Sequence, residues 1–195
     1  MNAGKSLQLL SVRQNYIENG GNVVLITSSI DRRSGVGKIA SRIGISEDAI
    51  AIGEADNLFE IVAGLHATKP VTVVLMDEVQ FFAVDHMWQA ARIVDDLNIP
   101  VMAYGLKNNV FGELFGPAIH AALALSDDVK EIKQLCWCGR KAGQILRYDR
   151  QGRTEKSGKV IEVGGDNRYI SVCRKHWMSD DIGPTRRAQC EDVAA

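Results

Sequence analysis

A short run at the start of the chain has the residue types that grip a phosphate group. Ala3, Gly4, Lys5 and Ser6 open a helical pattern and match the second half of a phosphate-binding loop, G-x-x-x-x-G-K-[ST]. In such a loop the glycine lets the backbone approach an anion, the lysine reaches the outer phosphates and the hydroxyl binds Mg²⁺. The first glycine would precede Met1, so we expect the true start, with a strand that carries the loop, to lie upstream. Taken alone, the run is more typical of an ordinary helix N-terminus with a solvated lysine.

An acidic pair follows the most apolar run of the sequence. Residues 71–76 read as a buried strand, and Asp77 and Glu78 come directly after it. At the carboxyl edge of a nucleotide-binding sheet, one acid can bind Mg²⁺ while its neighbour acts as a base. A strand that simply ends in solvated acids is the alternative. Because the phosphate run and the acidic pair occur in this order, the two together favour phosphoryl transfer.

Three cysteines and one histidine form two close pairs further along the chain. One residue separates Cys136 from Cys138, and two residues separate Cys173 from His176. Three thiolates and an imidazole make a full tetrahedral ligand set for Zn²⁺, which leaves no open position for catalysis. The sequence therefore predicts a structural zinc site, with unrelated buried cysteines as the alternative.

Strand-like and helix-like segments alternate along the first two-thirds of the chain and must position these groups. Continuous apolar strands that alternate with helices indicate an α/β fold with a parallel sheet covered on both faces. The expected helices are residues 4–19, 57–65 and 84–97, and the expected strands are 23–27, 50–52, 71–76 and 101–104.

The pattern changes near Asp127. Alternating residues at 144–148, a turn-rich charged stretch and a strand-like piece at 160–163 predict a small antiparallel unit. The expected division is a nucleotide-binding α/β domain at residues 1–128, a zinc-binding β domain at 129–178 and a disordered polar tail at 179–195.

Composition narrows the class of protein. The 195 residues are 46% hydrophobic and 24% charged, as in a soluble globular protein, and the formal net charge is −1. With this charge balance, the sequence has no excess of basic residues that would attract nucleic acid and no polybasic patch that would bind an anionic membrane. Apolar runs are too short to span a bilayer and we find no signal peptide, so we expect a cytoplasmic protein. In a reducing cytosol, paired cysteines hold a metal more often than they form disulfides.

Taken together, these motifs resemble the type II, zinc-containing thymidine kinase family, in particular its bacterial branch. The resemblance extends from Met1 to about Trp177, and the tight Cys-x-Cys spacing is similar to that of this branch. It implies a P-loop-type parallel sheet flanked by helices, plus a small zinc-binding β unit whose loop, residues 160–169, folds over the substrate as a lid. The matching segments are residues 1–6, 30–33, 41–44, 77–82, 112–115, 136–141 and 164–176.

The resemblance also implies an activity, the transfer of the γ-phosphate of ATP to the 5′-hydroxyl of thymidine by a homotetramer with structural Zn²⁺ and with Mg²⁺ bound to ATP. Glu78 matches the carboxylate that takes the proton from the hydroxyl. Lys5 and Arg33 match cations that neutralise the transferring phosphoryl group, and Gln80 matches a residue on the nucleotide side. The ATP-binding and phosphate-binding set is Met1, Asn2, Ala3, Gly4, Lys5, Ser6, Asp31, Arg33, Asp77 and Gln80. The thymidine-binding set is Phe81, Leu106, Phe115, Val163 and Tyr169, and the zinc ligands are Cys136, Cys138, Cys173 and His176.

Two other classes remain open at this stage. One is an inactive remnant or binding module in which only the zinc unit folds. The other is a zinc-ribbon module for nucleic acid, which would need a clustered basic and aromatic face that the sequence lacks. The chain also departs from the branch at two places: Val110 replaces an aromatic pocket wall, and Glu162 adds a charge near the lid.

Overall fold

The computed structural model describes residues 3–31, 35–160 and 169–194. The chain forms two compact units. The first, here called the sheet unit, comprises Gly4–Lys107 and Phe115–Lys130. The second, here called the metal unit, comprises Met1–Ala3, Asn108–Leu114 and Glu131–Ala195. Residues 108–114, which the sequence-based division placed in the first domain, therefore belong with the second unit.

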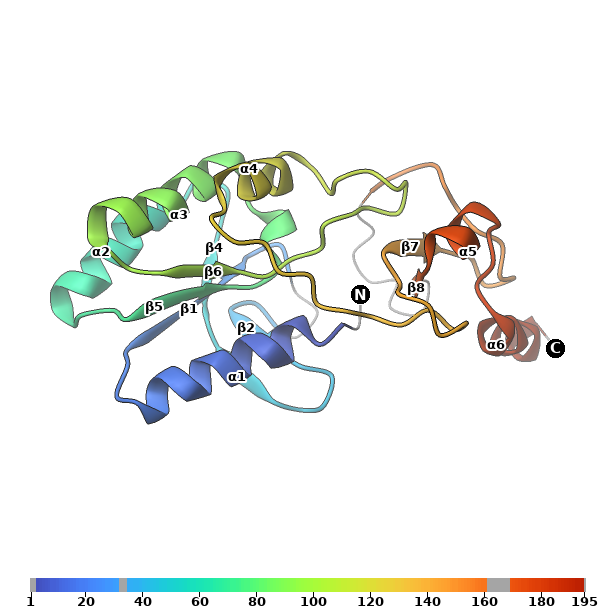
Figure 1. Ribbon diagram of the computed structural model, residues 1–195, viewed down its shortest axis with the longest axis horizontal. Helices are drawn as coiled ribbons and strands as arrows, with labels where there is room; N and C mark the ends of the chain where they lie inside the picture. Colours follow the sequence, from blue (N-terminus) through green and yellow to red (C-terminus); the bar gives the residue numbers. More distant parts are fainter. Residues whose placement is uncertain (1–2, 32–34, 161–168, 195) are drawn as a thin grey trace. The chain divides into compact units, whose positions relative to one another are not determined.

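Four parallel strands form the sheet of the sheet unit, in the order β4-β1-β5-β6 (Figure 1). The central pair, β1 (Val23–Ser28) and β5 (Val73–Met76), runs in register from Val23 opposite Val73. The outer strands are β4 (Ile50–Ile52) and β6 (Val101–Ala103). Every residue of β5 is buried, as expected for a strand covered on both faces. The predicted parallel α/β sheet is thus confirmed.

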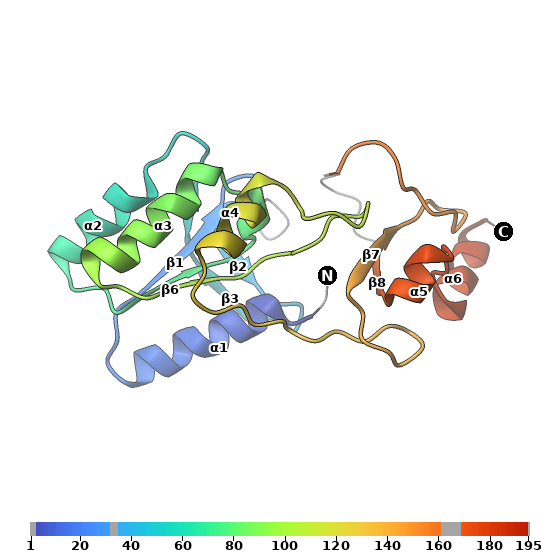
Figure 2. The same cartoon turned by 45° about the horizontal axis from the view of Figure 1, so that its top comes forward.

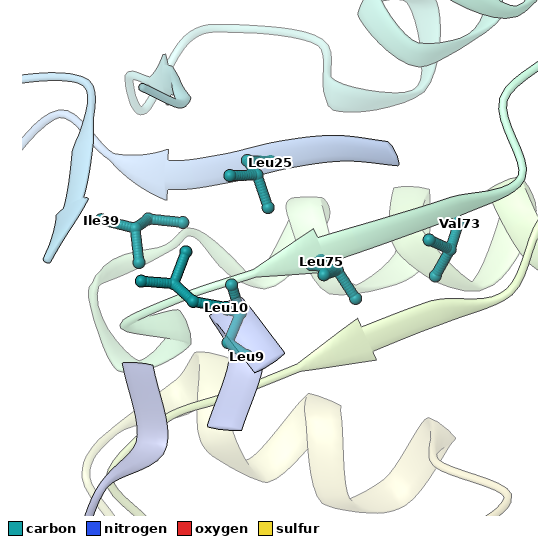
Figure 3. Close-up of a cluster of buried hydrophobic side chains, with 6 residues drawn as sticks. All are labelled: Leu9, Leu10, Leu25, Ile39, Val73 and Leu75. Carbon is teal, nitrogen blue, oxygen red and sulfur yellow. The ribbon is translucent and has the colours of Figure 1, made fainter. Parts of the chain in front are cut away.

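Helices cover both faces of this sheet. Helix α1 (Lys5–Glu18) lies on one face, while α2 (Leu58–Thr68), α3 (Val84–Leu97) and α4 (Pro117–Leu125) lie on the other (Figures 1 and 2). Leu9 and Leu10 of α1 lie on the apolar side of the helix that faces the sheet, which is wide enough to include two adjacent residues. They pack into a cluster of fully apolar side chains (Figure 3), whose buried members are Leu9, Leu10, Leu25, Ile39, Val73 and Leu75.

Contacts at the first turn of α2 explain why the helix begins where it does. Asn57 is the N-cap, and its side-chain oxygen accepts a hydrogen bond from the backbone N–H of Glu60 at 3.1 Å. The side chain of Gln89 on α3 accepts from the Leu58 N–H at 2.7 Å, which joins the two helices. Two backbone donors that the helix itself cannot satisfy are therefore paired.

Some elements of the sheet unit were not expected from the sequence. A hairpin of β2 (Lys38–Ala40) and β3 (Ser46–Asp48) follows β1, and α4 follows residue 116. Each hairpin strand has three residues, of which only Ile39 is buried, so no period of two is visible in the sequence. Residues 117–125 are apolar on most sides, which hides the one-sided stripe of a surface helix.

The metal unit is a small antiparallel structure, as predicted. Strands β7 (Gln144–Arg147) and β8 (Tyr169–Val172) pair antiparallel, with Gln144 opposite Val172. Strand β8 was not among the strands expected from the sequence. Of the expected strand at 160–163, residues 161–163 lie outside the described residues, as does most of the predicted lid. A short helix, α5 (Arg174–Met178), follows β8 directly.

The expected disordered tail contains a helix, so that expectation was wrong. Helix α6 (Pro184–Ala194) begins with a proline, which suits the first turn because no backbone N–H is needed there. Ile182, just before it, is only 1% exposed and packs with Leu146, Tyr148 and Val172. One buried isoleucine in a polar sequence was too weak a signal to predict this. In the described part of the chain, no helix has the length and apolarity needed to cross a membrane.

Candidate active site and metal centre

The two sequence runs with phosphate chemistry meet at one edge of the sheet unit. Asp77 comes directly after the buried strand β5, and Ser6 lies in the first turn of α1. The Ser6 hydroxyl donates a hydrogen bond of 2.7 Å to the Asp77 carboxylate. Gly4, which caps α1, has φ +77°, a left-handed conformation that glycine adopts without strain. The fold thus brings the phosphate run and the acidic pair together across 71 positions of sequence.

Asp77 is in an environment that disfavours its negative charge. Burial raises the pKa of its carboxyl group, and the charge of Glu78 acts in the same direction. The Ser6 hydroxyl and the Lys5 ammonium group lower the same pKa in part. A cation bound beside Asp77 would favour its charged form.

Glu78 is held in a strained backbone conformation. Glu78 is only 6% exposed. Its φ of 54° lies in the left-handed region, which residues other than glycine rarely adopt. Its N–H donates to the Asp77 carboxylate at 2.9 Å, which supports the turn. Strain of this kind, roughly 1–3 kcal/mol per residue, gathers at functional sites.

Gln80 lies beside Glu78 in the 3₁₀ turn η1 (Val79–Phe81). Its side-chain NH₂ donates to the Glu78 carboxylate, and its side-chain oxygen accepts from the Leu106 N–H at 2.9 Å. Leu106 follows β6 and was predicted to line the thymidine pocket. The contacts therefore connect the predicted base with one predicted substrate residue.

Two aromatic rings lie next to this polar group in the sheet unit. Phe81 and Phe115 pack edge to face, with ring centroids 5.8 Å apart and an interplanar angle of 87°. Phe81 ends η1, which places the pair beside Gln80 in the chain. The structure thus brings together three of the predicted thymidine-binding residues, Phe81, Leu106 and Phe115, near Glu78.

The other predicted site residues are placed differently. Asp31 follows β1 and is half-buried, its N–H donating to the Ser28 carbonyl at 3.1 Å. Tyr169 begins β8 in the metal unit. Met1, Asn2, Arg33 and Val163 lie outside the described residues.

Sequence reasoning missed two residues at this site. Tyr104, after β6, has its phenol pKa raised by burial and then by the charge of Asp77, so it lies within electrostatic reach of that acid. Gly105 lies against Val79 and Gln80. A glycine directly after a predicted strand was the signal that could have drawn attention to it.

The four predicted zinc ligands come together in the metal unit. Their ligand atoms all lie within 4.8 Å of one another. Cys136 Sγ and His176 Nδ1 are 3.3 Å apart, and Cys138 Sγ and Cys173 Sγ are 4.0 Å apart. Ligands held tetrahedrally at about 2.0–2.3 Å from Zn²⁺ would lie roughly 3.5–3.8 Å from one another. The cluster therefore fits a tetrahedral metal ion in both chemistry and spacing.

Local structure sets the direction of each ligand. A tight turn brings Cys136 and Cys138 together, with the Cys136 N–H donating to the Arg140 carbonyl at 2.7 Å. Cys173 caps α5, so His176 lies one helical turn away on the same face. Burial raises the pKa of the Cys136 thiol, whereas the His176 amide lowers that of Cys173.

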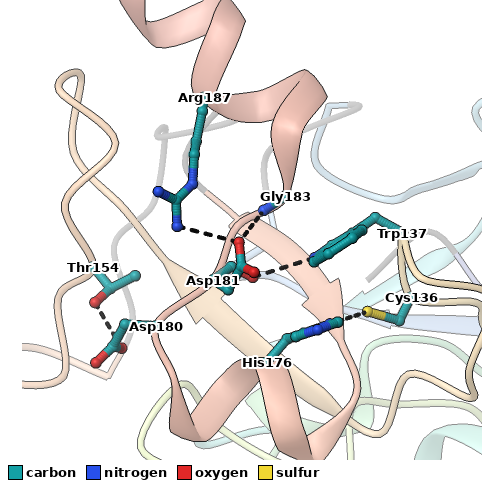
Figure 4. A network of polar contacts seen from close by, with 8 residues as sticks. All are labelled: Cys136, Trp137, Thr154, His176, Asp180, Asp181, Gly183 and Arg187. Atoms are coloured by element: carbon teal, nitrogen blue, oxygen red, sulfur yellow. Dashed lines mark hydrogen bonds and ion pairs between the residues drawn. The ribbon is translucent and has the colours of Figure 1, made fainter.

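Trp137 covers one side of the histidine ligand. Its ring stacks on the His176 imidazole with centroids 4.2 Å apart and an interplanar angle of 14°. The indole N–H donates to the backbone carbonyl of Asp181 at 3.4 Å (Figure 4). Asp181 in turn accepts from the Gly183 N–H and from Arg187 of α6. The segment before α6 is thereby tied to the metal centre.

Comparison with known proteins shows the family of the chain. A family model described as thymidine kinase matches residues 1–177. A thymidine kinase from Agrobacterium fabrum is 48% identical over 91% of this chain and 92% of its own length. Thymidine kinases from Ruegeria pomeroyi and Lactococcus lactis are 45% and 46% identical, covering 89% and 95% of their lengths.

The fold and site define a parallel α/β unit followed by a small unit whose cysteine–histidine cluster could hold a metal ion. A matched region of this extent, together with identities of this size, shows the family plainly. The chain belongs to the thymidine kinase family.

Proposed function

We propose that this chain transfers the γ-phosphate of ATP to the 5′-hydroxyl of thymidine and forms dTMP. The observation that carries the proposal is the contact between Ser6 and Asp77, with Glu78 as the next residue. The contact supports the proposal because it joins the start of α1, the proposed phosphate-binding end, to the acidic pair that would supply the proposed cation ligand and base. The thymidine kinases from other bacteria, which match over nearly all of their length, support the choice of nucleoside.

Each residue at this edge has a distinct part in the proposed reaction. Lys5 and the first amides of α1 bind the phosphates, and Ser6 and Asp77 hold the Mg²⁺ that accompanies ATP. When bound, the metal neutralises charge on the phosphate oxygens. Glu78 accepts the proton of the 5′-hydroxyl as that oxygen bonds to the γ-phosphorus and ADP leaves.

The nucleoside side of the site is proposed to be apolar with a few polar contacts. Phe81 and Phe115 form its walls, and Leu106 lies beside them. The family resemblance also assigns Val163 and Tyr169 to thymidine binding. A closely fitting pocket discriminates against a wrong base because the polar groups of the pocket are then left without hydrogen-bond partners.

Other proposed properties follow from the family and the metal centre. The cysteine–histidine cluster holds Zn²⁺ in a structural role, since four protein ligands leave no position for a substrate. We propose a cytoplasmic homotetramer, with no nucleic-acid or membrane partner. Asp31 and Arg33, like Met1, Asn2 and Ala3, are proposed to belong to the phosphate-binding set.

The direct test is nucleoside-dependent turnover by the purified chain. We expect ADP release in the presence of Mg²⁺ and thymidine, and a product phosphorylated at the 5′ position by NMR. Deoxycytidine serves as the matched control and should give much slower turnover. Equal rates with the two nucleosides would overturn the preference for thymidine over deoxycytidine, and no ADP release with either would overturn the proposed function.

A further inference from the structure

We infer that Gln80 is a positioning residue that aims the Glu78 carboxylate, and that Gly105 is required to leave room for it. This inference deepens the proposed function and rests on it. The family resemblance suggested a different task for Gln80, on the nucleotide side of the site. The contacts described above favour a task that acts through Glu78.

The orientation of the Gln80 amide is determined by its surroundings. A backbone N–H can only donate, so the Gln80 atom that faces the Leu106 N–H at 2.9 Å must be the oxygen. The NH₂ group then faces the Glu78 carboxylate, to which it donates. Gln80 is only 6% exposed. Losing either partner would leave a buried polar group unsatisfied, which resists any other orientation of the amide.

Glu78 has particular need of such support. Its left-handed backbone, with φ 54° and ψ 43°, directs the side chain away from the path of an ordinary strand end. A proton acceptor works only within hydrogen-bond reach of the hydroxyl. Errors of about 1 Å in such a placement can cost about 10²-fold in rate. The Gln80 amide links the carboxylate to the backbone of Leu106, three residues after the end of β6.

Gly105 keeps the space that this link occupies. A Cβ at this position would lie 2.6 Å from Val79 Cγ2 and 3.0 Å from the Gln80 side-chain oxygen. Its φ lies outside the left-handed range, so its backbone does not itself demand glycine. The constraint is therefore one of space, because even the methyl group of alanine would displace the Val79 side chain or the Gln80 amide that contacts the carboxylate.

Three single variants test this arrangement. Gln80→Met removes both amide contacts. Gln80→Glu keeps an acceptor for Leu106 but puts a second carboxylate against Glu78 in place of the donor. Gly105→Ala crowds the Val79 side chain and the Gln80 amide oxygen. We expect kcat for thymidine to fall about 10–100-fold in each, because a misaimed base slows proton removal. The KM for ATP should change less than about twofold. Gly64→Ala on α2, where a Cβ meets no atom within 4 Å, is the matched control and should keep wild-type kcat.

A double-variant cycle separates a positioning role from a merely structural one. In a Glu78→Gln background, Gln80→Met should cost almost nothing further, since a residue acting through Glu78 has no base left to aim. Full additivity, or a raised KM for ATP with unchanged kcat, would overturn the inference while leaving the proposed function standing. If the wild-type chain itself lacked thymidine-dependent turnover, the proposed function would fail and this inference with it.

Discussion

The two units of this protein are held together by different means. In the sheet unit, β5 is buried along its whole length, and α1 adds Leu9 and Leu10 to a continuous apolar cluster. In the metal unit, the two paired strands have four residues each, and the buried cluster includes two cysteines of the metal centre. Apolar burial can stabilise the first, whereas so small a core usually needs a metal or a disulfide.

The difference also separates the kinds of site that the two units can carry. Glu78, the proposed base, and Gln80 lie in the turn that follows the buried strand β5, which fixes the position of both side chains. The metal unit fixes its ligands through a short turn and a five-residue helix. We therefore expect the two units to respond differently when either kind of support is removed.

Metal removal should have the largest effect, and it should be confined to the metal unit. Structural Zn²⁺ supplies on the order of 10 kcal/mol to the folding of small metal domains. A chelator, or Cys173→Ser, should unstack Trp137 from His176 and change its fluorescence. A Trp88→Phe background removes the signal of the sheet unit, where Trp88 lies on α3. Fluorescence that stays constant while the metal is stripped, as followed by atomic absorption, would contradict the account.

Truncating the apolar core should come next and should act through the sheet unit. Leu75 is 0% exposed at the centre of β5, so Leu75→Ala should lower the free energy of unfolding by about 2–5 kcal/mol. Leu65→Ala on α2 is the control, because Leu65 is 38% exposed and should cost far less. Urea unfolding measures both variants. Equal losses would mean that the β5 cluster is not what stabilises this unit.

The sequence predicted the parts of the fold with strong periodicity. Residues 84–97 were expected as a helix and form α3 with those bounds, and the strand expected at 71–76 forms β5 over its last four residues. The strands β2 and β3 were missed because three residues carry too little periodicity, and α4 was missed because it is apolar on most sides. The Cys-x-Cys and Cys-x-x-His pairs could be predicted to form one centre because three thiolates and one imidazole make a full tetrahedral ligand set.

The candidate active site was only partly predictable. The Ser6–Asp77 contact follows from motif order, since a helix start and a strand end meet at one sheet edge. The strain at Glu78 and the Gln80–Leu106 contact depend on backbone angles that no residue pattern encodes. The need for a glycine at 105 likewise depends on packing against Val79, which only the folded chain reveals.

Removing the N-cap of α2 should have the smallest effect on the free energy of unfolding of the sheet unit. Asn57→Ala deletes the acceptor for the Glu60 N–H and should cost about 1 kcal/mol of unfolding free energy. Asn57→Ser keeps a capping oxygen and should recover most of that loss. Thermal unfolding of the sheet unit is the measurement. A destabilisation equal to that of Leu75→Ala would show that capping matters far more here than expected.

The most direct test of the central claim is the turnover of Glu78→Gln beside the wild-type chain, with Mg²⁺, ATP and thymidine at saturation. Glutamine keeps the size of the side chain but cannot accept the proton, so kcat should fall about 10²–10⁴-fold with unfolding behaviour unchanged. A variant that phosphorylates thymidine at nearly the wild-type rate would contradict the assignment of Glu78 as the base.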